Sequence, residues 1–472
     1  MINRAHQARL LAGGFDSAFP FANWSLLCPV RFPIVQLKYA ADRRPGRPPQ
    51  AEGLPHSYNR PVNPNWPLRW PAEWHDAGAL ELLKGTPVGA LLLPSTADYQ
   101  SIVERARQLD IAICDLNHPP AGVEIVKGEW PGVRMTPGQG DASSGPTGAP
   151  WIDSNGWLVR LTHARKPGGT VWVSADPPKS NEIVPLSRHL VALADGAAHG
   201  GRWVLTLDKD LADDLAARKP DALNGWKKTM RAIAFFQAHG EWSAWPVDAV
   251  LSVVSSFSGA NEFFSRELLN LMARTNISYG IIATDAFRPE ALGGLRAVLY
   301  PDAQPPPARV RQAVLDFVER GGLLIAGPMW GPALGRPSTE ESPPRYATRR
   351  FGQGKIAMAY KQPEDPYEMA QDAQILLSHR YDLVRFFNGF LLGAYSTVSP
   401  DGKRRLTHIV NYGGGADDDD PATVRIAGHF RSAKLWSIES AEARRLELVA
   451  QKDGIEVPLP GLAVYGGVEL EA

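Results

Sequence analysis

Five acidic residues come at or just after the ends of short apolar segments, in positions from which carboxyl groups could act together. They are Asp115, Glu129, Asp153, Asp176 and Asp208. Cleavage of a glycosidic bond uses two carboxyl groups, because one protonates the leaving oxygen while the other attacks the anomeric carbon or activates water. The pattern therefore predicts a carboxylate pair, with Asp153, Asp208 and Glu129 as the catalytic candidates.

Tryptophans lie close to these acids in the sequence, at Trp130, Trp151 and Trp157. Their flat apolar rings suit the CH faces of sugar rings, although packing inside the protein is the simpler role for any single tryptophan. We expect substrate binding from these three rings and from three polar residues nearby, namely Asn155, Asp115 and Asp176.

Residues 147–157, TGAPWIDSNGW, follow a Gly- and Pro-rich run that is too long for an ordinary strand–helix connection. Long ordered loops of this kind are often functional. We expect Asp153 to point into a cleft, with Trp151 or Trp157 as a stacking wall and Asn155 donating to a hydroxyl group. The alternative is that Asp153 or Ser154 caps the following helix, and Asp208 could equally serve as a cap.

The elements around these residues alternate between strand and helix patterns. Apolar segments at 88–94, 111–117, 123–130, 170–176 and 202–208 read as strands, and helical spacing between them favours a parallel sheet. A second alternating unit begins near residue 247, with strands at 249–257, 279–284, 295–302 and 321–328. After residue 345, one helix at 365–388 is followed by short alternating strands that are typical of a sandwich.

Residues 294–328 run from a strand ending at a proline, through a helix, to a Gly-Gly turn and another strand. This stretch, together with 351–360, 408–413 and 457–471, resembles the three-domain bacterial β-galactosidases and related glycoside hydrolase-like proteins. The resemblance implies an α/β chain with a TIM-barrel-like catalytic domain over 1–245. A flavodoxin-like domain of the class I glutamine-amidotransferase type would span 246–345, and an all-β C-terminal sandwich 346–472. The five acids would then lie at the carboxyl ends of barrel strands.

The sequence departs from this family at two places. The Asn-Glu pairs Asn181-Glu182 and Asn261-Glu262 do not fall at barrel strand four, where the galactosidases place theirs. The turn at 327–331, GPMWG, lacks the cysteine of a working amidotransferase, which argues against a third reading, amide hydrolysis in the middle domain. We expect a glycoside hydrolase acting on oligo- or polysaccharide. The alternative is a noncatalytic carbohydrate-binding or scaffolding protein with a degenerate barrel.

The composition limits the classes of partner that we expect this protein to bind. The 50 lysine and arginine residues equal the 50 acidic ones, which gives no general attraction for nucleic acid. Cys28 and Cys114 form no CxxC pair, the histidines show no zinc spacing, and the acid run Asp417–Asp420 reads as a solvated loop, so we expect no metal and no cofactor. No apolar run is long enough to span a membrane. We expect a cytoplasmic protein, or an exported one whose signal this chain lacks, and an oligomer contact through the amidotransferase-like domain.

Overall fold

The computed structural model describes residues 66–472, apart from 116–117, 137–141, 144–149, 178, 180–183, 333, 341 and 416–421. Cys28, the Asn181-Glu182 pair and the acid run Asp417–Asp420 lie outside the described residues. Within the described chain, the mixed α/β class predicted from the sequence is confirmed. None of the described helices combines the length and apolar character needed to cross a membrane.

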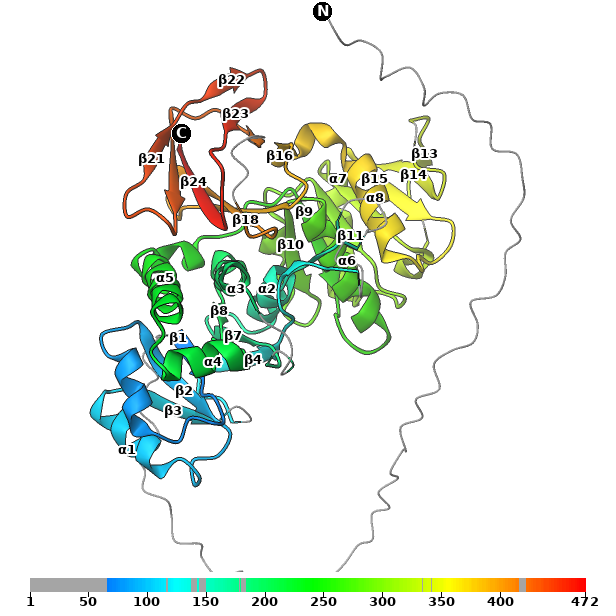
Figure 1. Ribbon diagram of the computed structural model, residues 1–472. Helices are drawn as coiled ribbons and strands as arrows, with labels where there is room; N and C mark the ends of the chain where they lie inside the picture. The colour runs from blue at the N-terminus through cyan, green and yellow to red at the C-terminus, as the bar shows by residue number, and fades with distance from the viewer. Residues whose placement is uncertain are drawn as a thin grey trace, which may run out of the picture. The chain divides into compact units, whose positions relative to one another are not determined.

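Six parallel strands form the first part of the described chain (Figure 1). They are β1 (Trp66–Arg69), β2 (Val88–Leu93), β3 (Ala112–Asp115), β4 (Val123–Lys127), β7 (Thr170–Ser174) and β8 (Arg202–Trp203). Two sheets result, in the orders β1-β2-β3 and β4-β7-β8, and every pairing within them is parallel. A parallel bridge between Leu68 and Leu205 joins β1 to the segment that follows β8. The two sheets and this bridge together give the strand order β3-β2-β1-β8-β7-β4, with β3 and β4 at the two edges.

The two sheets share one apolar interior. Its buried members come from both sheets: Ala90, Leu92, Cys114, Trp172 and Val204. The fully buried Trp172 ring supplies much of the filling volume in this interior. The described residues thus contribute six parallel strands that curve around one apolar interior, and this arrangement is called the barrel-like ring below.

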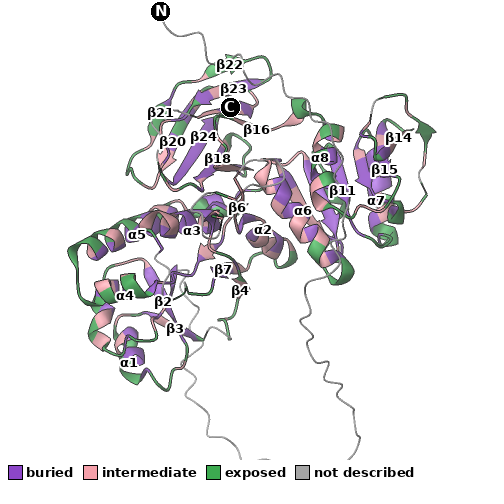
Figure 2. Cartoon of the chain, turned by 45° about the vertical axis from the view of Figure 1, so that its right-hand side comes forward, coloured by how far each residue is buried: buried purple, intermediate pink, exposed green. Residues whose placement is uncertain are grey.

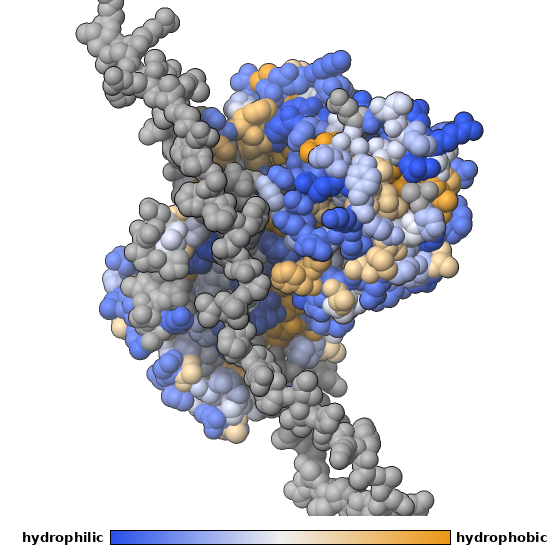
Figure 3. Space-filling model, turned by 90° about the vertical axis from the view of Figure 1, so that its right-hand side faces the viewer, coloured by the Kyte–Doolittle hydropathy of each residue, from blue (hydrophilic) through white to orange (hydrophobic). Residues whose placement is uncertain are grey.

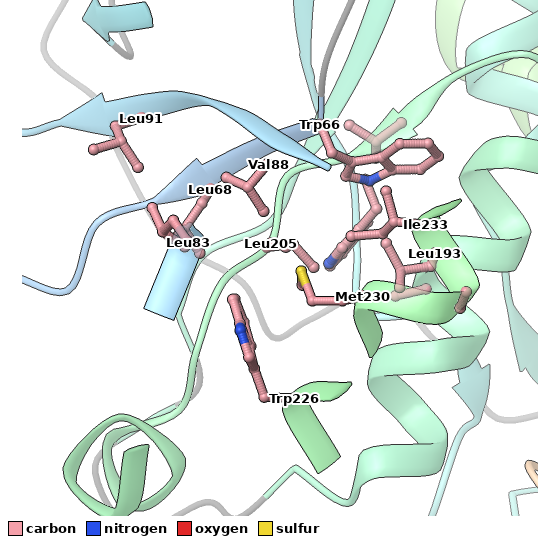
Figure 4. Packing of buried hydrophobic residues seen from close by; sticks show 14 of the residues in the cluster. Trp66, Leu68, Leu83, Val88, Leu91, Leu193, Leu205, Trp226, Met230 and Ile233 are labelled. Atoms are coloured by element: carbon pink, nitrogen blue, oxygen red, sulfur yellow. The ribbon is translucent and has the colours of Figure 1, made fainter. Parts of the chain in front are cut away.

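Helices cover the outer faces of these strands. They are η1 (Ala77–Leu83), α1 (Gln100–Gln108), α2 (Gly156–Arg165), α3 (Leu186–Ala198), α4 (Lys209–Ala216) and α5 (Pro220–Ala238). Figure 4 shows how Leu193 of α3 and Met230 and Ile233 of α5 meet residues of β1 and β2 in one packed cluster. Burial of these apolar side chains removes their surface from water and is the main force that holds helices to strands. The short hairpin β5 (Gly132–Val133) and β6 (Ile152–Asp153) is inserted between β4 and α2.

A seven-stranded sheet follows, in the order β10-β9-β11-β12-β15-β14-β13. Its strands are β9 (Leu251–Ser255), β10 (Tyr279–Ala283), β11 (Ala297–Tyr300), β12 (Leu323–Ala326), β13 (Arg336–Pro337), β14 (Tyr346–Phe351) and β15 (Gly354–Ala359). Its helices are α6 (Glu262–Arg274), α7 (Ala308–Glu319) and α8 (Pro366–Leu377). The predicted boundary after residue 345 needs correction, because β15 pairs in parallel with β12 and α8 packs in the same core as α6.

The predicted helix over 365–388 is too long. Helix α8 ends at Leu377, and Ser378 has a φ of 75°, a left-handed conformation that stops the helix. The following residues reach strand β16 (Val384–Phe387) instead.

Two antiparallel sheets complete the chain. One has the order β16-β19-β23-β22 and the other β17-β18-β24-β20-β21. The remaining strands are β17 (Leu392–Val398), β18 (Arg404–Asn411), β19 (Thr423–Ala427), β20 (Ser432–Ser437), β21 (Arg444–Leu446), β22 (Val449–Gln451), β23 (Gly454–Pro458) and β24 (Tyr465–Glu471). Apolar residues of both sheets form one core, and strands β18 and β24 are coloured as largely buried in Figure 2. The face drawn in Figure 3 is mostly hydrophilic, with hydrophobic residues in small groups.

Candidate functional site

Asp208 is a buried carboxylate beyond the end of β8. Only 2% of the residue is exposed, and its Oδ1 accepts a hydrogen bond of 2.9 Å from the amide of Leu211, which caps α4. Its Oδ2 lies 3.5 Å from Nε2 of His189, which is 3% exposed and comes from α3. The capping role considered from the sequence is therefore real, but one carboxylate oxygen still faces a buried imidazole.

The surroundings of Asp208 favour its charged form. Burial alone would raise the pKa of this carboxyl group, but the close approach of His189 and the hydrogen bond from Leu211 outweigh it and lower the pKa. Asp208 is therefore ionised at neutral pH. An ionised carboxylate can act as a nucleophile or a general base, whereas it cannot donate a proton.

Aromatic rings adjoin this pair. The Trp130 ring centroid is 5.3 Å from that of His189 and 5.1 Å from that of Trp203, both in edge-to-face arrangements. The indole nitrogen of Trp130 donates a 3.0 Å hydrogen bond to the carbonyl oxygen of Asp176. Trp130 is partly buried and lies beside His189, the residue whose imidazole approaches Asp208.

A cavity of about 490 Å³ opens against Asp208 and His189. It lies among α3, α4, α5 and the segment after β8, and Trp226 contributes to its wall. Further polar lining residues are Asp210, Asp214, Asp221, Asn224, Lys228 and Thr229. Its volume falls in the range of small-molecule sites, and its mixture of apolar wall and polar groups is typical of them.

Glu129 is exposed directly after β4, and Asn155 fixes its backbone. The Asn155 side chain accepts a 2.9 Å hydrogen bond from the Glu129 amide and donates one of 2.9 Å to the Glu129 carbonyl. Asn155 itself is 3% exposed. The prediction that Asn155 donates to a substrate hydroxyl is corrected, because its amide group is used inside the protein.

Asp195 of α3 continues this network. Its Oδ2 accepts hydrogen bonds from the backbone and side-chain nitrogens of Asn155, at 2.8 and 3.1 Å. Its Oδ1 accepts a 2.7 Å hydrogen bond from the hydroxyl of Tyr412, which follows β18. Burial raises the pKa of Asp195 although these donors oppose the rise. Asp195 and Tyr412 were missed from the sequence because 217 positions separate them.

Tyr412→Phe removes one hydrogen bond from this fully buried carboxylate and leaves the ring in place. We expect the free energy of unfolding at pH 7 to fall by about 1–3 kcal/mol, because a buried oxygen of Asp195 loses its hydrogen-bond partner. Urea unfolding measures the change. Tyr395→Phe is the matched control, because the Tyr395 hydroxyl has no hydrogen bond to another described residue. Equal losses in both variants would contradict the role given to Tyr412.

Asp153 does not occupy the position expected of it. Its two oxygens accept hydrogen bonds of 3.0 and 2.5 Å from the Arg134 guanidinium, and Asn155, not Asp153 or Ser154, stands at the N-cap of α2. Trp151 is not a free stacking wall either, because Arg274 lies 3.5 Å and Arg134 5.2 Å from its ring centroid. This bidentate ion pair favours the ionised form of Asp153, which argues against a role for this residue as the proton donor.

The other predicted residues lie apart from one another. Trp157 packs in the core of the seven-stranded sheet and lines a small internal cavity. The Asp115 carboxylate is 3.0 Å from Nδ1 of His118, and that of Asp176 is 2.8 Å from Nζ of Lys127. Of the predicted set, the structure gathers Asp208, Trp130 and the backbone of Asp176 in one region.

Neither a thiol site nor a metal site emerges from the described residues. Burial raises the pKa of the Cys114 thiol to about 11, so this group inside the barrel-like ring is a poor nucleophile. The turn at 327–331 carries Met329 and Trp330 where an amidotransferase nucleophile would stand. Among the described side chains, no group of three or more potential ligands could hold a metal ion.

No protein-family model matches the chain, and no curated protein matches its sequence. Solved structures of glycoside hydrolases are similar to it at low sequence identity. α-L-Fucosidase isoenzyme 2 from Paenibacillus thiaminolyticus is 12% identical, with 83% of this chain and 79% of the fucosidase covered and a TM-score of 0.48. A catalytic mutant of Gan42B, a GH42 β-galactosidase from G. stearothermophilus, is also 12% identical, with 79% and 66% covered and a TM-score of 0.45. The rhamnosidase from Novosphingobium sp. PP1Y is 10% identical, with 80% and 38% covered and a TM-score of 0.46.

Proposed function

We propose that this protein is a glycoside hydrolase acting on an oligo- or polysaccharide, with Asp208 and Glu129 as its two carboxyl groups. The observation that carries the proposal is the placement of Asp208. It is buried against His189 after a strand of the barrel-like ring, on the wall of a cavity of about 490 Å³. In β/α barrels the residues that act on substrate lie at the carboxyl ends of the strands.

The two carboxyl groups would take different roles. Asp208 is ionised at neutral pH and would activate water or attack the anomeric carbon, while the exposed Glu129 would protonate the leaving oxygen. Strand β7 lies between β4 and β8, so the two acids follow strands that are not direct neighbours in the sheet.

One observation favours a second candidate, a carbohydrate-binding protein without catalysis. Four of the five predicted acids are already paired with basic side chains: Asp115 with His118, Asp153 with Arg134, Asp176 with Lys127 and Asp208 with His189. Asp208 is the one of these four that lines the cavity of about 490 Å³, and Glu129 forms no ion pair with a described residue. A sugar could still bind beside Trp130 and Trp226 if these two did not act as a pair.

A panel of aryl glycosides tests the two candidates. We expect the protein to hydrolyse at least one of them, and Glu129→Gln to lower the rate about 100-fold or more on substrates with poor leaving groups. The loss should be smaller with nitrophenyl substrates, since a good leaving group needs little protonation. Glu104→Gln on α1 is the control.

Equal rates for Glu129→Gln and the wild-type protein would remove Glu129 from the mechanism. If no substrate were cleaved while neutral oligosaccharides still raised the melting temperature, the binding candidate would stand.

A further inference from the structure

A cavity with basic walls lies far from Asp208 along the chain, in the seven-stranded sheet. Its volume is about 810 Å³. The walls come from residues 289–296 before β11, 320–323 before β12, 353–355 between β14 and β15, and 375–381 after α8. The groove therefore lies where β11 and β12 begin. Ligands of doubly wound sheets usually bind at the opposite, carboxyl end of the strands.

Basic side chains dominate this groove. The lining includes Arg296, Arg320, Lys355 and Arg380 against two acids, Glu290 and Glu340. Glu340 is already paired, because it forms ion pairs with Lys355 and with Arg350. Among the ion pairs between described residues, none involves the three arginines of the groove.

Two of these arginines converge on one ring. The guanidinium carbon of Arg296 is 4.2 Å and that of Arg380 4.5 Å from the centroid of Tyr381, and Arg380 also donates a 2.6 Å hydrogen bond to the Tyr381 hydroxyl. Each guanidinium makes a favourable cation–π contact with the ring, and neither forms an ion pair with an acidic described residue. An anion bound in the groove would supply the missing counter-charge and accept hydrogen bonds from these guanidinium groups.

Apolar and backbone surfaces lie next to the arginines. Ile375 is 58% exposed, and Pro289 and Tyr381 line the same groove. Gly294 and Gly321 have φ values of 77° and 114°, and open space surrounds the position of a Cβ at both. The groove thus offers exposed apolar side chains, those of Ile375 and Pro289, beside separated positive charges.

We propose that this groove binds an acidic oligosaccharide, one that carries carboxylate or sulfate groups along its length. Planar guanidinium groups match the geometry of carboxylates and sulfates, and the apolar wall suits the CH faces of sugar rings. The choice of a saccharide as the carrier of the charges rests on the proposed function, whereas the binding of anions does not.

Isothermal titration with a galacturonic acid hexamer tests the proposal, with a neutral glucose hexamer and inorganic sulfate as comparison probes. We expect the acidic hexamer to bind at low salt, and the double variant Arg296→Gln and Arg380→Gln to weaken it about tenfold or more. Arg320→Gln tests the same groove without changing the contacts of Tyr381. Arg444→Gln, an exposed arginine on β21, should leave the affinity unchanged.

Three results would overturn the proposal: no binding of the acidic hexamer, equal affinity in the double variant, or equally tight binding of the neutral hexamer. Tight binding of sulfate alone, with no gain for the hexamer, would also overturn it, since it would show a simple anion site. Failure here leaves hydrolysis of neutral aryl glycosides untouched. Loss of that hydrolysis with binding retained would refute only the proposed function.

Discussion

Asp208→Asn is expected to lower glycoside turnover by about 1,000-fold or more, because an amide can neither attack the anomeric carbon nor take a proton from water. The fold should survive this change. Asn is as good an N-cap as Asp, so the hydrogen bond from Leu211 and the start of α4 are retained. The measurement is the steady-state rate on the best substrate of the aryl glycoside panel, with melting temperatures taken in parallel.

Asp153→Asn is the control for this experiment. Both oxygens of Asp153 are bound by Arg134, and half of the Arg134 side chain is solvent-exposed at 49%. We expect turnover within about twofold of the wild type, because the lost ion pair is partly exposed and contributes little. Full activity in Asp208→Asn, or a large loss in Asp153→Asn, would exchange the roles of the two acids.

The local pattern of the chain was sufficient to predict many of its elements. The helix at 156–165 and the strand at 170–174 follow directly from apolar spacing, which depends only on neighbouring residues. Apolar spacing does not show which strands pair with each other in a sheet. The hairpin of β14 and β15 has the same alternating pattern in any sheet, so only its pairing with β12 shows that the boundary after residue 345 is misplaced.

Only part of the candidate site was predicted, because contacts between distant segments cannot be seen in the local sequence. Asp208 was identified because strand ends can be read from the sequence. His189 is one of several polar residues on a largely apolar helix, and nothing local shows that it faces Asp208. The ion pair between Asp153 and Arg134 depends on the β5–β6 hairpin, whose two strands are far apart in the sequence. A long Gly- and Pro-rich loop looks the same in the sequence whether it binds a ligand or only connects two paired strands.

Two histidines, the buried His408 and the partly buried His199, are expected to make the stability of the fold depend strongly on pH. His408 on β18 is 3% exposed, and its Nδ1 lies 2.8 Å from the hydroxyl of Tyr465. His199, after α3, has Nδ1 2.9 Å from the carbonyl oxygen of Asp195, and its ring packs on Tyr395. The pKa of His199 is lowered to about 4, mainly by burial and also by Arg160, although its hydrogen bond to the Asp195 carbonyl opposes the change. The pKa of His408 is lowered to about 3, mainly by burial and also by the nearby His199.

Because these pKa values lie below that of an unfolded histidine, about 6.5, the unfolded chain takes up protons first as the pH falls. Stability is therefore complete above pH 6.5 and is lost toward pH 4. The expected slope is about 1.4 kcal/mol per pH unit for each histidine, so the pair costs about 6 kcal/mol by pH 4. A loss of that size is comparable to the whole stability of a typical domain. Urea unfolding at several pH values between 7 and 4 measures it.

His408→Gln should reduce the slope between pH 6 and 4 by about 1.4 kcal/mol per pH unit, because glutamine does not titrate. The variant will also be less stable at pH 7, since a packed ring is lost, so the slope rather than the stability itself carries the comparison. His118→Gln is the control, because this histidine is on the surface, with 84% of its side chain exposed. Buried acids such as Asp195 act in the opposite direction, since burial raises their pKa, but they contribute equally to both variants and cancel. A slope unchanged by His408→Gln would mean that this imidazole is already protonated in the folded protein at pH 6.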